Sequence, residues 1–510
     1  MTADSLDLDG LIRRVRRVPV DGRTTSAPTG AGTVDLRVRD GVVTEVAPRL
    51  VPVPEDAFVH DAEGRWAIPG LWDQHVHLGQ WAATLTRLDM SGTASAAEAV
   101  DRVRAHLSTL SDPDEAVIGF GHRSAVWDEP ATVAGLDAVS GDRPVALISG
   151  DAHNGWLNSA AQRFLDVPPT GGPLTENDWF AVLPRVTDLP GITARESGGY
   201  RVALRRAAAA GVVGVVDFDF GDPLSGWTER FGPGYDTLRV RVATYPDTLN
   251  AVLGAGLRTG DPIPGCAGLV TMGPLKIISD GSLNTRTAHC HEPYADAPDG
   301  SRGASNVSPD VLGEWFTRAR AGGLRVAIHA IGDAAASTAL DVFAATGARG
   351  SIEHVQLITV ADIARMARLG VAASVQPAHL LDDRDVTMLC WPDRAERCFA
   401  LGSMRRAGVE LRLGSDAPVS PLDPWLAMAA AVHRTADDRP AWTPSEALTP
   451  AQALAASTDG QGTLGVGSRA DIVLLDADPL AHEQPAEAAV GLRSMPVAAT
   501  FAGGRPVFLR

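Results

Sequence analysis

Cysteine is scarce in this sequence: only four occur in 510 residues, and none forms a Cys-x-x-Cys pair. Disulfide frameworks belong mainly to small secreted domains, so we expect reduced thiols. Apolar runs are short as well, and no stretch approaches the 18 residues that a membrane-spanning helix needs. The arginines at 13–17 precede no apolar segment of the kind found in secretory signals. These absences together predict a cytoplasmic protein.

Positive charge is also in deficit, with 45 Lys and Arg against 62 Asp and Glu, for a formal net charge of −17. This balance argues against nucleic acid and against anionic membrane surfaces as partners. Hydrophobic residues make up 45% of the chain, an ordinary share for a globular protein with a large core. A small-molecule substrate is the partner that these features leave open.

Both ends of the chain show the period-two pattern of β-strands. Near the start, residues 34–39 and 42–46 alternate around an Asp40-Gly41 turn, which is a hairpin signal. Near the end, residues 470–476 and 496–508 read as strands around Gly-rich turns. We therefore predict one small β-sandwich assembled from residues 1–66 and 465–510.

The body of the chain alternates short β-branched runs with amphipathic helical stretches, such as residues 310–321 and 360–369. A doubly wound sheet is the alternative, but no Gly-rich phosphate fingerprint follows the first strand. The pattern predicts an α/β fold with a (β/α)₈ TIM-like barrel over residues 67–464. Its eight strands are expected near residues 71–77, 211–217, 238–243, 275–280, 324–329, 350–354, 371–376 and 409–416.

Far more chain than one helix needs separates the first two strands. We interpret residues 80–200 as a large insertion over the barrel mouth, where loops after strands carry function. Tryptophans in this insertion and beyond suggest an apolar or aromatic substrate, although tryptophans more often serve packing. They are Trp127, Trp156, Trp179 and Trp391.

Six polar residues lie on or at the ends of five of these strands. His75 and His77 share one face of the first strand, a spacing that suits a borderline cation such as Zn²⁺. Each residue alone has a structural explanation: a core histidine, a lysine reaching solvent, or an aspartate capping a helix. Chance accounts poorly for the whole set, because barrel enzymes place their chemistry at this end. The set is His75, His77, Lys276, His329, His354 and Asp416.

A lysine buried beside two cations is unfavourable unless its pKa falls or it is modified. Carbamylation would turn Lys276 into an anionic oxygen ligand, and two metal ions would favour that form. The sequence therefore predicts one or two divalent metal ions, with zinc first and other divalent metals as alternatives.

Longer motifs make the sequence resemble the amidohydrolase superfamily, in particular the amidohydrolase-3 group that includes the YtcJ-like and N-substituted formamide deformylase proteins. They occur in family order over nearly the whole chain. The motifs are Pro69-Gly-Leu-Trp-Asp-Gln-His-Val-His77, Asp151-Ala-His-Asn-Gly-Trp-Leu-Asn-Ser159, Leu275-Lys-Ile-Ile-Ser-Asp-Gly-Ser282, Ile328-His-Ala-Ile-Gly-Asp333, Ile352-Glu-His354, Val375-Gln-Pro-Ala-His379 and Gly414-Ser-Asp416.

The resemblance implies that His75, His77 and Asp416 hold one metal. It also implies that His329 and His354 hold a second, with carbamylated Lys276 between the two. Asp416 would be the catalytic base that activates water and returns the proton to the leaving amine. As a weaker inference, His153 and His379 would contact the substrate. A homodimer is a family-level expectation.

These features predict a metal-dependent amidohydrolase that cleaves a non-peptide C–N bond, in an amide, N-acyl or N-formyl compound. Hydrolysis of an ester, lactone or cyclic amide is the nearest alternative at the same site. A non-hydrolytic decarboxylase or isomerase on this scaffold is a second alternative. A third is a barrel that binds a ligand without turnover, which the complete set of six polar residues argues against.

Overall fold

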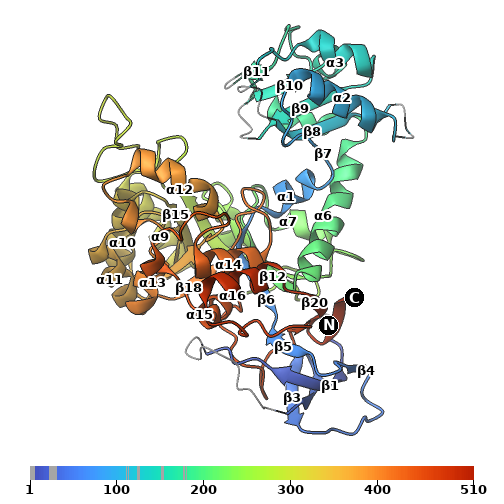
Figure 1. Ribbon diagram of the computed structural model, residues 1–510, viewed down its shortest axis with the longest axis vertical. Helices are drawn as coiled ribbons and strands as arrows, with labels where there is room; N and C mark the ends of the chain where they lie inside the picture. The colour runs from blue at the N-terminus through green and yellow to red at the C-terminus, as the bar shows by residue number, and fades with distance from the viewer. Residues whose placement is uncertain are drawn as a thin grey trace. The chain divides into compact units, whose positions relative to one another are not determined.

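The computed structural model describes residues 6–21, 32–110, 112, 114–122, 124, 127–150, 154–175, 178–179 and 181–510. The chain divides into two compact units, which are drawn in Figure 1. One unit is formed by Met1–Leu78 with Leu204–Arg510, and the other by Gly79–Ala203. Among the described residues, no helix has the length and apolar character needed to cross a membrane.

The larger unit contains the predicted barrel, an eight-stranded sheet in which every neighbouring pair is parallel. A parallel bridge between Val76 and Ala417 brings the two edges of the sheet together. The order is β6 (Leu71–Val76), β12 (Val212–Asp217), β13 (Arg239–Thr244), β14 (Val270–Ile278), β15 (Val326–Ala330), β16 (Gly350–His354), β17 (Ala372–Val375) and β18 (Leu411–Leu413).

All eight predicted strands are present, because runs rich in Val, Ile and Leu suit strands that are buried on both faces. Two strands end more than one residue before the predicted position. Strand β14 ends at Ile278 and β18 at Leu413, so Asp280 and Asp416 lie in the loops that follow. Asp416 has a φ of 59°, outside the extended region, so a strand could not continue through it.

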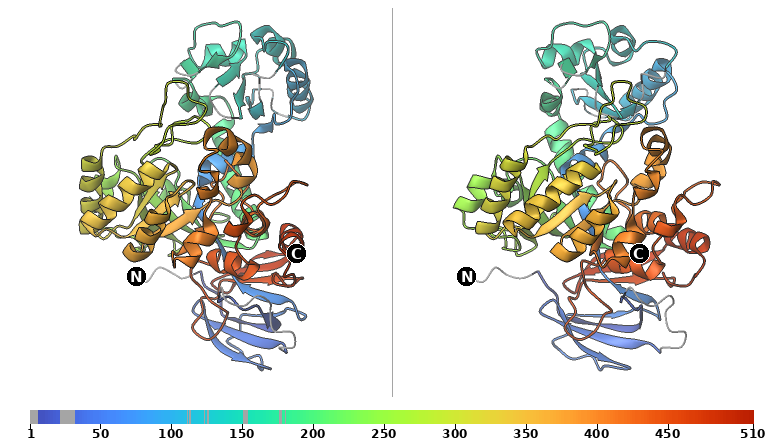
Figure 2. Two further views of the ribbon diagram at one scale, coloured as in Figure 1. Left: turned by 60° about the vertical axis from the view of Figure 1, so that its left-hand side comes forward. Right: turned by 90° about the vertical axis from the view of Figure 1, so that its left-hand side faces the viewer.

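Helices α9 (Pro309–Ala321), α10 (Asp333–Thr346) and α11 (Val360–Leu369) lie on the outside of the barrel (Figures 1 and 2). Local signals set their ends. The side chain of Ser308 caps α9, which has proline in its first turn, and that of Thr359 caps α11. Gly370 ends α11 in the left-handed conformation. The predicted helices at 310–321 and 360–369 are therefore confirmed.

Both chain ends build one mixed sheet, as predicted. Its path is β21-β20-β19-β5-β1-β2-β3, and β4 pairs with β1. Apolar residues from both ends, such as Leu36 and Phe501, share one core. The strands are β1 (Gly10–Arg17), β2 (Val34–Arg39), β3 (Val42–Ala47), β4 (Phe58–Asp61), β5 (Trp66–Pro69), β19 (Ile472–Leu475), β20 (Val497–Ala502) and β21 (Arg505–Leu509).

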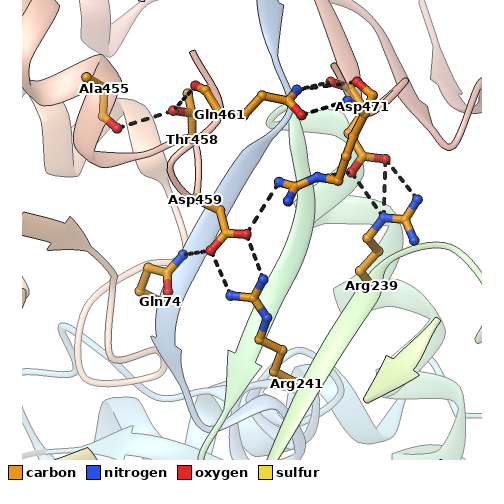
Figure 3. Close-up of polar contacts among 9 residues, drawn as sticks. Gln74, Arg239, Arg241, Ala455, Thr458, Asp459, Gln461 and Asp471 are labelled. Atoms are coloured by element: carbon orange, nitrogen blue, oxygen red, sulfur yellow. Dashed lines mark hydrogen bonds and ion pairs between the residues drawn. The ribbon is translucent and has the colours of Figure 1, made fainter. Parts of the chain in front are cut away.

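A network of charged residues connects the barrel to this terminal sheet (Figure 3). Arg241 of β13 makes a bidentate pair with Asp459, with both N–O distances at 2.7 Å. Arg239 binds Asp471, which directly precedes β19, with an Nε–Oδ2 distance of 3.0 Å. When a guanidinium group makes two parallel hydrogen bonds to one carboxylate, both the distance between the two side chains and their relative orientation are fixed. The two ion pairs therefore hold β13, on the side opposite the barrel mouth, against the C-terminal segment.

The smaller unit has its own sheet, in the order β11-β10-β9-β8-β7. Its core contains Trp127, Trp156 and Trp179, while Trp391 is buried in a cluster of the larger unit. The four tryptophans thus serve packing and give no support to an aromatic substrate. The elements are β7 (Leu88–Asp89), α2 (Ala96–Leu107), β8 (Val117–His122), α3 (Val133–Ser140), β9 (Val145–Ser149), β10 (Asn154–Leu157), α4 (Ser159–Phe164) and β11 (Leu174–Thr175).

Candidate metal centre

The two histidines of the first strand meet Asp416 from the last. His75 is the last residue but one of β6 and His77 directly follows the strand, so both imidazoles point to one side. The Nε2 atoms of His75 and His77 each lie 3.4 Å from Oδ1 of Asp416. The backbone holds this arrangement, because Asp416 N donates to His75 O at 2.7 Å and His77 N to Ala417 O at 2.9 Å.

A second group forms around the other oxygen of Asp416. Ligand atoms of His354, His379 and Asp416 all lie within 4.8 Å of one another. Nε2 of His379 is 3.9 Å from Oδ2 of Asp416, and the His354 and His379 rings stack with centroids 6.2 Å apart. His379, predicted as a substrate contact, therefore lies beside candidate ligands, at the start of α12 (His379–Cys390).

Two of these residues have backbone conformations that are unusual for residues other than glycine. The φ angle is 71° at His354 and 59° at Asp416. Left-handed φ values cost roughly 1 kcal/mol or more in such residues. Strain of this kind is maintained where surrounding structure fixes the direction of a side chain, and here it coincides with the cluster.

His329 lies next to the cluster but faces partly away from it. Its ring is 4.5 Å from that of His354, while its Nε2 lies 3.2 Å from Gly281 O and 3.3 Å from Oδ1 of Asp280. Asp280 is fully buried and accepts hydrogen bonds from three backbone amides. His329 is therefore anchored through Nε2, which leaves Nδ1 as its remaining donor atom.

Lys276 is 2% exposed on β14, which rules out the interpretation that it reaches solvent. Its Nζ lies 3.5 Å from Nε2 of His75 and 4.3 Å from the centroid of the Phe218 ring. Burial lowers the pKa of Lys276 to about 8, although Glu353 and Asp416 oppose the shift. The amine is therefore still mostly protonated at neutral pH, but its neutral form is far more populated than in a lysine with an ordinary pKa.

Glu353 is a member of the site that the sequence did not single out. It is 1% exposed, and its Oε2 lies 2.9 Å from Nδ1 of His75. The hydroxyl of Ser351 donates to its other oxygen at 2.5 Å. A glutamate on a strand expected to be buried on both faces was the available signal, because glutamate is almost never buried without a partner.

The electrostatics favour neutral imidazoles next to an ionised carboxylate. Burial, and then the charge of Lys276, hold the pKa of His75 well below its usual value; burial and His329 do the same for His354. Burial raises the pKa of Asp416, but His75 and a hydrogen bond from His77 outweigh it and bring the pKa well below its usual value. Neutral histidine and ionised aspartate are the forms that bind metals.

The cluster fits a divalent cation. Within the cluster, three buried ring nitrogens have no hydrogen-bond partner among the described residues: Nδ1 of His77, Nδ1 of His354 and Nε2 of His379. The bond from His75 Nδ1 to Glu353 leaves Nε2 available, the arrangement in which a carboxylate orients a metal-binding histidine. Nitrogen donors with one carboxylate suit Zn²⁺.

The structure thus brings together His75, His77, His354, His379 and Asp416, with Lys276 and His329 beside them. The predicted substrate contact His153 lies outside the described residues. The assignment of individual ligands stays a prediction.

Known proteins resemble this chain over most of its length. It is 26% identical to the putative amidohydrolase YtcJ of Bacillus subtilis, over 90% of this chain and 93% of that protein. It is 25% identical to the N-substituted formamide deformylase of Arthrobacter pascens, over 91% and 92%. The crystal structure of an uncharacterized metal-dependent hydrolase from Pyrococcus furiosus superimposes with a TM-score of 0.76 at 24% identity, covering 92% of this chain and all of that one.

The last comparison supports the barrel fold. The sequence model of the amidohydrolase family matches residues 59–508, from the end of the N-terminal strands to the last strand. This match includes every barrel strand and all the residues of the cluster. The chain belongs to the amidohydrolase family.

Proposed function

We propose that this protein is a metal-dependent hydrolase that cleaves a C–N bond in a non-peptide amide, N-acyl or N-formyl compound. One observation carries the proposal: Asp416 presents its two oxygens to two groups of histidines at the carboxyl ends of barrel strands. The relative named as an N-substituted formamide deformylase, similar over 91% of this chain, supports the choice of bond.

His75, His77 and Asp416 would hold the metal, and His354 would lie within reach of it. A bound divalent cation, zinc first among them, supplies Lewis acidity that acidifies water and polarises a carbonyl group. Glu353 keeps the proton of His75 on Nδ1, so that Nε2 faces inward. The protein's contribution is a set of donors that is oriented before the substrate arrives.

Asp416 is the residue that handles the proton. Its low pKa keeps the carboxylate ionised at neutral pH, the form that a base requires. As the C–N bond breaks, the same group returns this proton to the nitrogen of the leaving amine, because amide hydrolysis requires a protonated leaving group. Its φ of 59° and the hydrogen bond from its amide to His75 O fix the position of the carboxylate.

Lys276 is proposed to be carbamylated. The amine is buried, its pKa is lowered to about 8, and Nζ lies 3.5 Å from Nε2 of His75. Carbon dioxide reacts with the neutral amine, and the resulting carbamate would give the centre an additional anionic oxygen donor.

All four cysteines are free and buried, in keeping with a reducing cytoplasm as the site of the reaction.

The test combines metal analysis with a substrate panel. Protein purified without chelator should contain divalent metal and hydrolyse N-formyl or N-acyl amines, with esters and lactones as the comparison arm. Asp416→Asn should lower kcat at least about 100-fold, the usual range for losing a general base. Asp438→Asn, an exposed position, is the matched control. Metal-free protein, or cleavage of esters alone, would overturn the proposal.

A further inference from the structure

We propose that Asp459 is a positioning residue for the reaction and acts from the side of the barrel opposite the mouth. It holds strand β6 through Gln74, the residue next to His75. In this way it fixes the position of the two histidines that the strand presents at the mouth. The inference rests on the proposed function, because turnover supplies its main readout. It gives the C-terminal segment, residues 457–471, a role in the rate of the reaction as well as in the fold.

Strand β6 is bound differently along its two edges. On one edge it pairs with β12. On the other, it meets the chain that follows β18 near the mouth. Nearer its start, the amide of Trp72 donates to Ser457 O and that of Gly70 to Asp471 O, both at 2.8 Å. The C-terminal segment therefore takes the place of a barrel strand beside the first half of β6.

The carboxylate of Asp459 is the centre of this contact (Figure 3). It accepts the bidentate pair from Arg241, a bond from Nη2 of Arg469 at 3.3 Å, and a bond from Nε2 of Gln74 at 3.2 Å. Burial raises the pKa of Asp459, but Arg241, followed by Arg469 and Gln74, outweighs burial and brings the pKa below its usual value. The carboxylate is therefore ionised, and an ionised acceptor holds the Gln74 amide more strongly than a neutral one.

The turn that carries Asp459 is fixed by contacts of its own. It follows α15 (Pro450–Ala456). Thr458 is fully buried, with Oγ1 2.7 Å from Gln461 O. The side chain of Gln461 in turn accepts from Arg469 N at 3.0 Å. A carboxylate on a fixed turn can hold a neighbouring strand in place.

Trp72 adds a second constraint on the same strand. The guanidinium carbon of Arg241 lies 4.1 Å from the centroid of its ring, a cation–π contact. Trp72 is 3% exposed, and a Cβ added at Gly214 of β12 would come within 2.4 Å of the ring. The glycine therefore makes room for this packing. Arg241 thus holds two side chains of β6, Trp72 directly and Gln74 through Asp459.

A displacement at Gln74 carries over to the reacting groups. Successive residues of a strand are about 3.3 Å apart and are joined by planar peptide units. The next residue, His75, accepts a hydrogen bond at its backbone oxygen from Asp416 N at 2.7 Å. A misplacement of about 1 Å in catalytic groups can lower the rate about 100-fold. Loss of the hold at Asp459 should therefore lower kcat.

The experiment compares two ion pairs of the same network. Asp459→Ala removes the acceptor of Gln74, whereas Asp471→Ala removes the partner of Arg239 and leaves Gln74 bound. Asp459→Ala should lower kcat at least about 10-fold on the N-formyl amine that wild type hydrolyses best, with little change in KM. Asp471→Ala is the matched control. Its carboxylate is 1% exposed against 11% for Asp459, so it should lower the free energy of unfolding at least as much and leave kcat unchanged.

A second variant leaves both ion pairs in place. Gln74→Leu should lower kcat by the same factor as Asp459→Ala. The double variant should be no slower than Asp459→Ala alone, because both changes break one contact. Asp459→Asn should restore part of the rate, since its amide oxygen can still accept from Gln74. Full kcat in Gln74→Leu, or an equal loss of kcat in the two alanine variants, would overturn the inference.

Hydrogen exchange reads the hold on β6 without turnover. Peptides that contain Gln74 and His75 should exchange faster in Asp459→Ala than in Asp471→Ala. Equal exchange in the two variants would overturn the inference even if the enzyme is active. Wild type that contains no metal and hydrolyses nothing on the panel would refute the proposed function, and with it the role of Asp459 in the reaction.

Discussion

At the scale of single residues, the buried carboxylate of Glu353 decides which nitrogen of His75 faces the centre. With Nδ1 held at 2.9 Å, only Nε2 remains for Asp416, Lys276 or a cation. Burial raises the pKa of Glu353, while Lys276 and the Ser351 hydroxyl oppose that shift. Glu353 is thus a positioning residue that acts through His75.

Glu353→Ala should weaken metal binding about 10–100-fold, the usual effect of removing the partner of a metal-binding histidine. Glu353→Gln should weaken it less, because the amide oxygen can still accept the proton of Nδ1. Competition against a chromophoric chelator measures both values. Glu410→Ala, at an exposed position paired with Arg412, controls for general loss of negative charge. Unchanged affinity in the alanine variant would contradict this role.

Residue types at strand ends were enough to predict part of the cluster. His75, His77 and His354 lie in or directly after predicted strands, and Asp416 follows the last one. The position of His379 could not be predicted in this way, because it depends on the direction that α12 takes after β17. The first turns of α12 are bound to the loop after β16 by the hydrogen bond from Gln356 to Asp383, which are far apart in the sequence.

At the scale of elements, Asp217 at the end of β12 binds the backbone at Leu78, just after the first barrel strand. Its carboxylate accepts hydrogen bonds from the backbone amides of Leu78 and Asp219, both at 3.1 Å. Burial, and then the charge of Asp219, raise the pKa of Asp217 to about 7. The carboxyl group of Asp217 therefore keeps its proton to unusually high pH.

The sign of the pH effect follows from this shift. Between the unfolded pKa near 3.8 and the folded value of about 7, the native state binds more protons than the unfolded state. The contribution of Asp217 to stability is therefore present at low pH and is lost as pH rises through this window. Asp217→Asn removes the titration, so the variant should gain stability relative to wild type between pH 4 and pH 7.

The gain amounts to roughly 4 kcal/mol if the whole shift is realised, at about 1.4 kcal/mol per pKa unit. Urea unfolding of both proteins at several pH values between 4 and 8 measures the difference. If the difference in the free energy of unfolding between the two proteins stays the same at every pH, Asp217 is ionised in the folded protein.

Element type was predictable and element ends were not. β-branched runs identified all eight barrel strands, since such residues suit strands that are buried on both faces. The ends of β14 and β18 depend on where the backbone leaves the extended conformation to aim a side chain. At Asp416 this reflects its hydrogen bond to His75 O, a contact across the closing edge that local sequence cannot specify.

At the scale of the whole molecule, the candidate ligands come from the two ends of the barrel sheet. β6 carries His75 and His77, and Asp416 follows β18; these edges meet through the bridge between Val76 and Ala417. A cation bound to both edges would hold the barrel closed. The Gly79–Ala203 unit, by contrast, contributes none of the described ligand candidates.

Removal of metal should therefore destabilise one unit of the protein selectively. A free metal concentration of about 100 times Kd adds about 2.7 kcal/mol to the free energy of unfolding, and a chelator should abolish this gain. Hydrogen exchange with and without chelator should show faster exchange in peptides from β6, β16 and β18. Peptides from β8 and β9 of the Gly79–Ala203 unit serve as the internal control. Equal acceleration in both units would mean that the cation does not act through the closing edge of the barrel.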